Sequence, residues 1–465
     1  MFVRFFCIII AVTSYVYGDQ IKDKRPNILL ILSDDQGYGD AGFQGSKDIK
    51  TPNLDRLAGS GLICTNGYVT HPYCSPSRAG LMTGRYQSRF GHERNPRFGT
   101  DEGLPLNQKL MPQYLKEAGY TTGWIGKWHL GDSKPYQPGS RGFDQCFGFY
   151  GGGHQFLNWK PNPKNEYCMP IMKDGKEVNV TGHLTSRLGK EAAEFVQRNA
   201  TDKKPWFLYL AFNAPHTPNQ PTPEKYAEMS HIPNSQRRAY AAEVSHMDDA
   251  IGDVMQALKE SGQIDNTLVF FLSDNGGRDI DNEGESLWHG ADNGGLRGGK
   301  GHVYEGGVRV PFVVSWPAQL PKGKKFDHPI SSLDLLPTIM ASAKQKLPTN
   351  QHYDGMNILP FLNSDKQKPA SRTLFWRRSE WRVVGMRQDH MKLVRKHGIK
   401  DQLFNLKNDS AEQENIAIKQ YDYMQQMEDE LDKWLATLAK KDAFLGEGPE
   451  PEPQWVPPAN MPEKQ

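Results

Sequence analysis

Uninterrupted apolar runs of strand length recur along the chain, and segments with helical spacing of apolar residues separate them. Residues 110–120 and 238–262 have the spacing of amphipathic helices, and each ends at or near a glycine. The four clearest apolar runs are NILLILS (27–33), WFLYLAF (206–212), TLVFFLS (267–273) and PFVVSW (311–316). Strands that are apolar on both faces and alternate with helices are typical of parallel sheets covered by helices. The pattern therefore predicts an α/β fold built on a large, mostly parallel sheet.

The pattern changes after about residue 365. Four short segments (TLFWRR, WRVVGMRQ, HMKLVRK and DQLFNL) alternate in polarity, with turn signals between them. They predict a small antiparallel sheet, followed by one helix at about 419–440. A proline-rich stretch then predicts an extended tail. We accordingly expect a catalytic α/β domain over 19–365, a C-terminal antiparallel sheet plus helix over 366–445, and a tail over 446–465.

The first 18 residues have the pattern of a secretory signal peptide. Arg4 precedes a short apolar core, and small and polar residues follow as far as Gly18. This core is too short to span a bilayer, and no other apolar run is long enough. The sequence thus predicts a secreted or periplasmic protein with no stable membrane anchor.

The composition narrows the expected partners. Hydrophobic residues make up 37% of the chain and charged residues 24%, as in soluble globular enzymes. The formal net charge is only +2, and no broad basic region is present. A nucleic-acid partner is therefore not expected.

The cysteines leave one question open. Cys7 lies in the signal peptide, and the remaining cysteines include no CxxC pair of the kind that binds zinc. Export would permit a disulfide, for which Cys146 and Cys168 are the best candidates. Cys74 stands in a loop-like run, HPYCSPSRAGLMTGRY (71–86), where it could be a thiol nucleophile, half of a disulfide or a metal ligand.

Polar residues follow three of the apolar runs directly. Asp34 and Asp35 follow the first, Asp274 and Asn275 follow the third, and His216 lies just beyond the second. Ligands of open α/β sheets sit beyond the carboxyl ends of the strands, so these side chains should share one crevice. Carboxylate and amide oxygens suit Ca²⁺, or less well Mg²⁺, better than zinc. A divalent cation would also offset the cost of gathering this much negative charge.

Cationic and imidazole side chains occur in loops of the same region. GKWHLG (126–131) places Lys127 and His129 two residues apart, and these share a face if the segment is extended. The glycine-rich stretch 294–311 carries Arg297, Lys300 and His302, and its glycines let backbone N–H groups approach a ligand. A metal ion and lysines can neutralise the charge on the oxygens of a tetrahedral anion, and a histidine can protonate its leaving group.

The segment CSPSRAGLMTGR (74–85) resembles the C-x-P-S-R signature of type I sulfatases. Its companions occur in the family's order: the Asp-Asp pair, GKWH, APH, SDNGG and GGKGHVYEGGVRVP. The resemblance spans roughly residues 25 to 440. It implies the fold of the alkaline phosphatase superfamily, with a smaller C-terminal antiparallel sheet, and the activity of an arylsulfatase-type sulfuric ester hydrolase.

The resemblance also answers the question about Cys74. It implies that a maturation enzyme recognises C-x-P-S-R and converts this cysteine to formylglycine, an aldehyde that hydrates to a geminal diol. One diol oxygen attacks sulfur, and the other then expels sulfate by C–O cleavage and restores the aldehyde. A plain serine hydroxyl would instead retain a stable sulfate ester.

By the same resemblance, each remaining site residue has a role. The implied Ca²⁺ ligands are Asp34, Asp35, Asp274, Asn275 and the modified Cys74. Arg78 would orient the diol, while Lys127 and Lys300 would bind sulfate oxygens. His129 would assist deprotonation of the diol, and His216 would protonate the leaving alcohol. No substitution suggests an inactive relative.

The sequence indicates the substrate less clearly than it indicates the reaction. The interpretation favoured here is a carbohydrate sulfate ester, such as a sulfated galactan like carrageenan or a galactosamine-containing glycan, handled by an enzyme resembling secreted bacterial sulfatases. Candidate substrate-binding residues are His92, Glu93, Arg94, His154 and Arg297. Three alternatives stay open: a phosphodiester or phosphonate monoester hydrolase of the same superfamily, a silent glycan-binding protein, and a thiol enzyme using Cys74 with nearby His71.

Overall fold

A computed structural model describes residues 25–202, 204–278, 289–363, 369–380 and 382–439. The expected signal peptide and the proline-rich tail lie outside these residues, as does the expected domain boundary near residue 365. No helix in the described part of the chain is long and apolar enough to cross a membrane.

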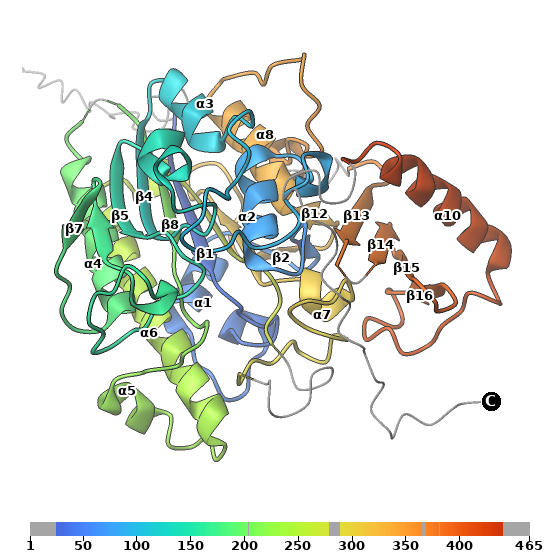
Figure 1. Ribbon diagram of the computed structural model, residues 1–465, viewed down its shortest axis with the longest axis horizontal. Helices are drawn as coiled ribbons and strands as arrows, with labels where there is room; N and C mark the ends of the chain where they lie inside the picture. Colours follow the sequence, from blue (N-terminus) through green and yellow to red (C-terminus); the bar gives the residue numbers. More distant parts are fainter. Residues whose placement is uncertain (1–24, 203, 279–288, 364–368, 381, 440–465) are drawn as a thin grey trace, which may run out of the picture.

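A ten-stranded sheet forms the centre of the larger part of the molecule (Figure 1). Its strands run in the order β11-β2-β10-β9-β1-β8-β4-β5-β6-β7. The five strands from β9 to β5 are mutually parallel, and antiparallel strands are added at both sides. In chain order the bounds are β1 Asn27–Ser33, β2 Leu62–Cys64, β4 Thr121–Lys127, β5 Gln145–Phe149, β6 Ile171–Lys173, β7 Lys176–Val178, β8 Trp206–Ala211, β9 Thr267–Ser273, β10 Phe312–Ser315 and β11 Lys324–Phe326. A separate parallel pair joins β3 (Gly67–Tyr68) to β12 (Ile330–Ser331). The prediction of a mostly parallel sheet is confirmed.

Helices cover both faces of this sheet. Helices α1, α4 and α6 pack together on one face, while α2, α3 and α8 lie on the other (Figure 1). The bounds are α1 Pro52–Gly59, α2 Cys74–Thr83, α3 Met111–Glu117, α4 Leu184–Arg198, α5 Pro223–Glu228, α6 Ser235–Glu260, α7 Glu305–Val308, α8 Leu335–Ser342 and α9 Leu359–Leu362. The two expected helices correspond to α3 and α6.

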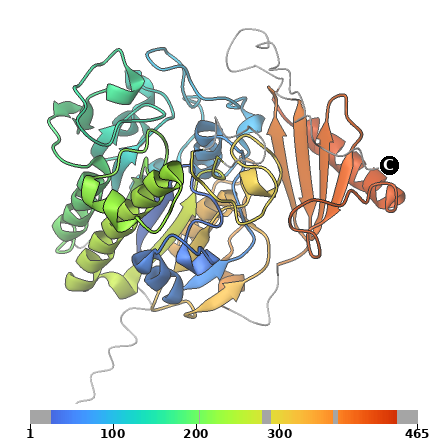
Figure 2. The same ribbon diagram turned by 90° about the horizontal axis from the view of Figure 1, so that it is seen from below.

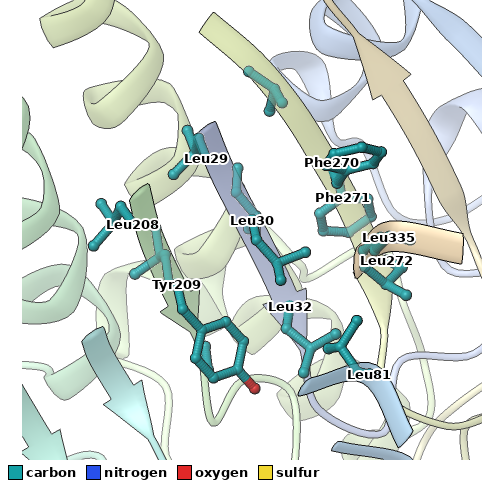
Figure 3. Close-up of a cluster of buried hydrophobic side chains, with 14 of the residues drawn as sticks. Leu29, Leu30, Leu32, Leu81, Leu208, Tyr209, Phe270, Phe271, Leu272 and Leu335 are labelled. Atoms are coloured by element: carbon teal, nitrogen blue, oxygen red, sulfur yellow. The ribbon is translucent and has the colours of Figure 1, made fainter. Parts of the chain in front are cut away.

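The central strands are apolar throughout because both of their faces are buried. Every residue of β1 is buried, and Leu30 and Leu32 lie among Leu81 of α2, Leu272 of β9 and Leu335 of α8 (Figure 3). Burying each such side chain contributes roughly 1.5–3 kcal/mol. This packing holds the carboxyl ends of the parallel strands in fixed positions.

The C-terminal part contains a four-stranded antiparallel sheet, as expected. Its strands, in spatial order, are β13 Thr373–Arg378, β14 Val383–Gln388, β15 Met391–Lys396 and β16 Gln402–Asn405. Helix α10 (Tyr421–Leu435) covers its outer face through a core that includes Met427, Leu431 and Trp434 (Figure 2). On the inner face, Trp376 of β13 donates a hydrogen bond to the Val69 carbonyl at 2.7 Å, so this sheet also packs against the larger part.

Two expectations about cysteines are wrong. Cys146 and Cys168 are both free thiols, so the suggested disulfide does not form. Cys74 is not in a loop but begins α2. Pro76 falls in the first turn of this helix, where proline is tolerated because its missing N–H has no helical partner. The Ser-Pro-Ser sequence therefore looked like a loop but starts a helix.

Candidate active site

Strand register brings the acidic residues together. Parallel strands β1 and β9 are paired from Asn27 opposite Thr267 to Ser33 opposite Ser273. The next residues, Asp34 and Asp274, therefore leave the sheet side by side. Asp35 then turns into the left-handed region, with φ of 61°, and its N–H donates to Oδ1 of Asp274 at 3.3 Å. All three acidic residues are buried, and they lie together just beyond the ends of β1 and β9.

Two lysines from other elements pair with the two adjacent aspartates. Lys127 ends β4, and its Nζ lies 2.6 Å from Oδ2 of Asp34. Lys300 comes from the glycine-rich segment, and its Nζ lies 2.7 Å from Oδ2 of Asp35. Burial opposes the charge on each lysine, but the carboxylates outweigh it and raise the pKa of both. Both lysines are therefore cationic within the site.

Arg78 is the third buried cation. It lies one turn after Cys74 on α2, and its Nε and Nη2 are each 2.8 Å from Oδ2 of Asp274. Its Nη1 donates to the Lys127 carbonyl at 3.2 Å and to the Tyr209 hydroxyl at 3.4 Å. Burial and the nearby Asp34 charge raise the pKa of Asp274 to about 6, although Arg78 opposes this shift.

The Cys74 thiol faces the two aspartates. Its Sγ lies 3.6 Å from Oδ1 of Asp34 and 3.9 Å from Oδ1 of Asp35, and the residue is only 1% exposed. Burial raises the pKa of this thiol to about 12, against the attraction of Lys127 and Lys300. The thiolate is therefore scarce at neutral pH, and an unmodified Cys74 would be a weak nucleophile.

The donor atoms fit a hard divalent cation. Ligand atoms of Asp34, Asp35, Cys74 and His216 all lie within 4.8 Å of one another. Asn275 donates its Nδ2 to Oδ1 of Asp35 at 2.7 Å, while its buried Oδ1 has no hydrogen-bond partner among the described residues. Carboxylate and amide oxygens are ligands that Ca²⁺ and Mg²⁺ prefer. The oxygen-rich donor set thus agrees with the ion expected from the sequence.

Two histidines complete the site. The Nε2 of His216 lies 3.5 Å from Oδ2 of Asp35, and its Nδ1 lies 2.7 Å from the Thr217 carbonyl oxygen. Because a carbonyl only accepts, Nδ1 carries hydrogen and Nε2 is the nitrogen that can exchange a proton. Burial and the charge of Lys300 lower the pKa of His216 to about 3. Burial, and then Lys127, lower the pKa of His129, whose backbone φ is 59°.

Comparison with known proteins agrees with this geometry. A family model described as Sulfatase matches residues 26–345, and a model described as N-sulphoglucosamine sulphohydrolase, C-terminal, matches residues 299–441. The chain belongs to the sulfatase family.

Individual relatives point in the same direction. The chain is 37% identical over 358 residues to N-acetylgalactosamine-6-sulfatase of Homo sapiens, covering 72% of this chain and 66% of that protein. It is 31% identical over 417 residues to the uncharacterized sulfatase YdeN of Escherichia coli (strain K12), covering 79% and 71%. The match therefore spans about two thirds of the human relative's length.

A solved structure is similar over nearly the full length. Ps i-CgsB, crystallised in complex with k-i-k-neocarrahexaose, has a TM-score of 0.85 and 40% sequence identity. The similarity covers 91% of this chain and 95% of that one. The large sheet and the C-terminal sheet of this sulfatase thus have a close structural counterpart.

The five residues suggested for substrate binding make contacts within the sulfatase itself. His92 is buried with its Nε2 2.7 Å from the Ser75 hydroxyl. Both ring nitrogens of His154 face carbonyl oxygens, those of Gln155 and Met169. The remaining contacts are Glu93 to Arg377 at 2.7 Å, Arg94 to Glu102 at 3.5 Å and Arg297 to the Glu412 carbonyl at 2.9 Å. His92, Glu93 and His154 are buried, and a role of the five residues in substrate binding stays a prediction.

Sequence reasoning missed two contributors to the site. The Tyr209 hydroxyl contacts Arg78, but this tyrosine lies inside the apolar strand β8 and gives no separate signal. Gly152 packs so closely on the His129 ring that an added Cβ would lie 2.5 Å from Nε2. The run of three glycines at 151–153 is the signal that could have indicated this close approach.

Proposed function

We propose that this sulfatase hydrolyses sulfate esters on a sulfated carbohydrate. One observation carries the proposal: the buried Cys74 thiol faces Asp34 and Asp35, and the charges of Lys127 and Lys300 act on it. Residue 74 is thus placed beside both a hard-cation site and two ammonium groups. A tetrahedral sulfur centre there could be attacked from residue 74 while its oxygens are neutralised.

Formylglycine at position 74 is part of the proposal. The raised pKa of the Cys74 thiol argues against direct attack by a thiolate. The C-x-P-S-R context of Cys74, Pro76 and Arg78 supports conversion by a formylglycine-generating maturation enzyme. The hydrated aldehyde would place an oxygen nucleophile where Sγ lies now.

The charges in the site favour a cation bound together with an anion. Three carboxylates are matched by three cationic side chains, those of Arg78, Lys127 and Lys300. With these side chains balanced, a divalent cation added alone would leave the site with two uncompensated positive charges. A singly charged sulfate ester bound beside the ion would offset one of them. We infer that Asp34, Asp35, Asp274, Asn275 and residue 74 hold Ca²⁺. Bound there, the ion would withdraw charge from sulfate oxygens.

The remaining side chains have separate tasks. Lys127 and Lys300 would turn from the aspartates towards sulfate oxygens. Arg78 would hold its position through the hydrogen bond of Nε and the ion-pair contact of Nη2 with Asp274. His216 is neutral in the free site, so its Nε2 would first have to gain a proton and would then pass it to the leaving alcohol, because Nδ1 is engaged by the Thr217 carbonyl. His129, fixed beside Gly152, would accept a proton from the nucleophile during release of sulfate.

The substrate class rests on the relatives. The human relative is named for N-acetylgalactosamine-6-sulfate chemistry, and the structural relative was crystallised with a neocarrahexaose. We propose a sulfated galactan, such as a carrageenan, or a galactosamine-containing glycan as substrate. Such polymers occur outside cells, which agrees with the proposed N-terminal signal peptide and a secreted or periplasmic location.

Two measurements test the function. Mass spectrometry of the peptide ending at Arg78 should show Cys74 converted to formylglycine in active protein, and an unmodified cysteine there would refute the mechanism. Release of sulfate from a panel of sulfated galactans and galactosamine glycans should exceed hydrolysis of phosphodiesters and phosphonate monoesters. Much faster turnover of the phosphorus esters would refute the assignment, and tight glycan binding without sulfate release would indicate a silent binding protein.

A further inference from the structure

Arg378 joins the two chain segments that carry residue 74 and Lys300. It ends β13 of the C-terminal sheet and is only 3% exposed. Its Nη2 donates to the Tyr73 hydroxyl at 2.8 Å, and its Nη1 donates to the Gly301 carbonyl. Tyr73 immediately precedes Cys74, and Gly301 immediately follows Lys300. A single guanidinium group from the C-terminal sheet thus contacts both segments.

The two segments are also bonded directly to each other. The Gly301 N–H donates to the Pro72 carbonyl at 2.9 Å, and the neighbouring Lys300 N–H donates to the Gly277 carbonyl at 3.0 Å. Gly277 lies two residues after Asn275, which is one of the residues inferred to hold Ca²⁺. The Lys300 backbone is therefore held between the segment that leads into α2 and the segment that follows Asn275.

The close packing around Arg378 requires a glycine at position 301. Gly301 has a φ of 94°, in the left-handed region that residues with a side chain rarely adopt. An added Cβ would lie 2.8 Å from Nη1 of Arg378 and 3.2 Å from the Tyr73 hydroxyl oxygen. The guanidinium carbon also lies 4.5 Å from the centroid of the Tyr73 ring, within the range of a cation–π contact. Arg378, Tyr73 and Gly301 therefore form one tightly packed contact.

The shape of the guanidinium group explains why an arginine suits this position. Its planar fork holds Nη1 and Nη2 at a constant separation, whereas a lysine offers one ammonium group on a flexible stem. The third nitrogen, Nε, lies 3.6 Å from Oε2 of Glu380, so an acidic group balances the charge without engaging either Nη. The fork therefore limits the distance between its two acceptors, the Tyr73 hydroxyl and the Gly301 carbonyl.

We propose that Arg378 is a positioning residue that fixes Lys300 relative to the nucleophile at position 74. In the free site Nζ of Lys300 lies 2.7 Å from Asp35. When it turns to a sulfate oxygen, its backbone stays linked through Arg378 to Tyr73, so the bound sulfur lies at a defined distance from residue 74. The inference rests on the proposed roles of residue 74 and Lys300, and it makes the C-terminal sheet a contributor to catalysis.

The test compares Arg378→Lys with the matched control Arg372→Lys. Arg372 immediately precedes β13 and pairs with the buried Asp334, with Nη2 2.6 Å from Oδ1, outside both catalytic segments. In Arg378→Lys, kcat per formylglycine-bearing molecule should fall at least about tenfold, since displacing a reacting group by about 1 Å can cost roughly a hundredfold, while KM changes by less than about threefold. In Arg372→Lys both constants should stay within about twofold of wild type, even if stability falls.

Two substrates show where the loss arises. The fall in kcat should be the same for a carrageenan oligosaccharide and for 4-nitrophenyl sulfate, because the displaced group acts at sulfur. A loss confined to the oligosaccharide would indicate that Arg378 serves glycan binding and would overturn the proposal. An unchanged kcat on both substrates would overturn it as well.

Tyr73→Phe provides a second, milder variant that keeps the aromatic ring and removes only the hydroxyl acceptor. It should lower kcat by about threefold on its own, since one of the two contacts of the fork is lost. In the double variant with Arg378→Lys, kcat should be no lower than in Arg378→Lys alone, because the contact is already broken there. Losses that multiply in the double variant would contradict a shared role.

Hydrogen exchange separates this inference from the proposed function. Peptides that contain the Lys300 and Gly301 amides should exchange faster in Arg378→Lys than in wild type, and at the wild-type rate in Arg372→Lys, whether or not a sulfate ester is hydrolysed. Mass spectrometry measures the exchange. Equal exchange in all three proteins would overturn the inference even in an active enzyme. A wild-type protein that releases no sulfate but shows the exchange difference would refute the proposed function and support the contact itself.

Discussion

Lys127 and Asp34 form an ion pair in which both side chains are fully buried, with Nζ 2.6 Å from Oδ2. The lysine ends β4 and the aspartate follows β1, and β8 lies between these two strands in the sheet. The pair therefore joins the ends of non-adjacent strands across the floor of the active site.

Replacing Lys127 by methionine should destabilise the protein and abolish turnover. The change leaves the buried Asp34 carboxylate with Arg78 Nη2, at 3.8 Å, as its nearest remaining cation. Loss of one partner from a buried pair typically costs about 3–5 kcal/mol. Denaturant unfolding and sulfate release would measure the two effects. The control is Lys116→Met, which breaks a solvent-exposed pair with Asp144 and should cost less than about 1 kcal/mol. Equal losses in the two variants would contradict the prediction.

Chelation should lower the thermal stability of protein purified with Ca²⁺. An ion that binds only the folded state, at a hundred times its Kd, adds about 2.7 kcal/mol. The melting temperature with and without a chelator measures this effect independently of activity. Asn275→Ala removes an amide oxygen from the cluster and should shrink the calcium-dependent shift, whereas Asn408→Ala, at an exposed position, should not. A calcium shift of wild-type size in Asn275→Ala would argue against this ligand.

Gly152→Ala should impair catalysis more than folding. The added Cβ would lie 2.5 Å from Nε2 of His129 and 2.9 Å from Oε1 of Glu166, so the imidazole must move. Displacing a reacting group by about 1 Å can cost roughly a hundredfold in rate. Steady-state kinetics and thermal unfolding should be compared with Gly139→Ala, where an added Cβ meets nothing within 4 Å. The idea fails if both variants retain full activity.

A buried acid in the C-terminal part should make stability depend on pH. Burial, opposed by Lys392, raises the pKa of Glu412 to about 7. The folded state then binds more protons than the unfolded state between the unfolded pKa and pH 7, so this group lowers stability as pH rises through that window. In Glu412→Gln, stability should not show this decrease with rising pH. Unfolding free energies measured from pH 4.5 to 7.5 should diverge with rising pH in favour of the variant. Parallel curves for the two proteins would contradict the assignment.

The sequence predicted the central strands well because their cause is local. β1 and β9 match their expected apolar runs residue for residue, since burial on both faces requires apolar side chains throughout. β4, with the sequence TTGWIGK, was not among the expected strands because two glycines interrupt its apolar pattern. The expectation that Lys127 and His129 share a face assumed an extended segment, and β4 ends at Lys127.

The site was predictable as far as it follows from strand ends and a family signature. Contacts between distant segments were not. The pairing of Arg78 with Tyr209 depends on how α2 lies over β8, which no local pattern records. Likewise, nothing near Glu93 indicates that its carboxylate pairs with Arg377 on a sheet 284 residues further along. Side chains that look available in a loop can already have partners in the fold.

The burial of α2 has a consequence for how the protein is made. All ten residues from Cys74 to Thr83 are buried, and they form helix α2. A maturation enzyme that must reach the thiol and read Pro76 and Arg78 meets none of them on the folded surface. The proposed conversion therefore belongs to the nascent chain. A molecule that folds before conversion could no longer be modified. The active fraction of a preparation would therefore depend on the rate of modification relative to the rate of folding.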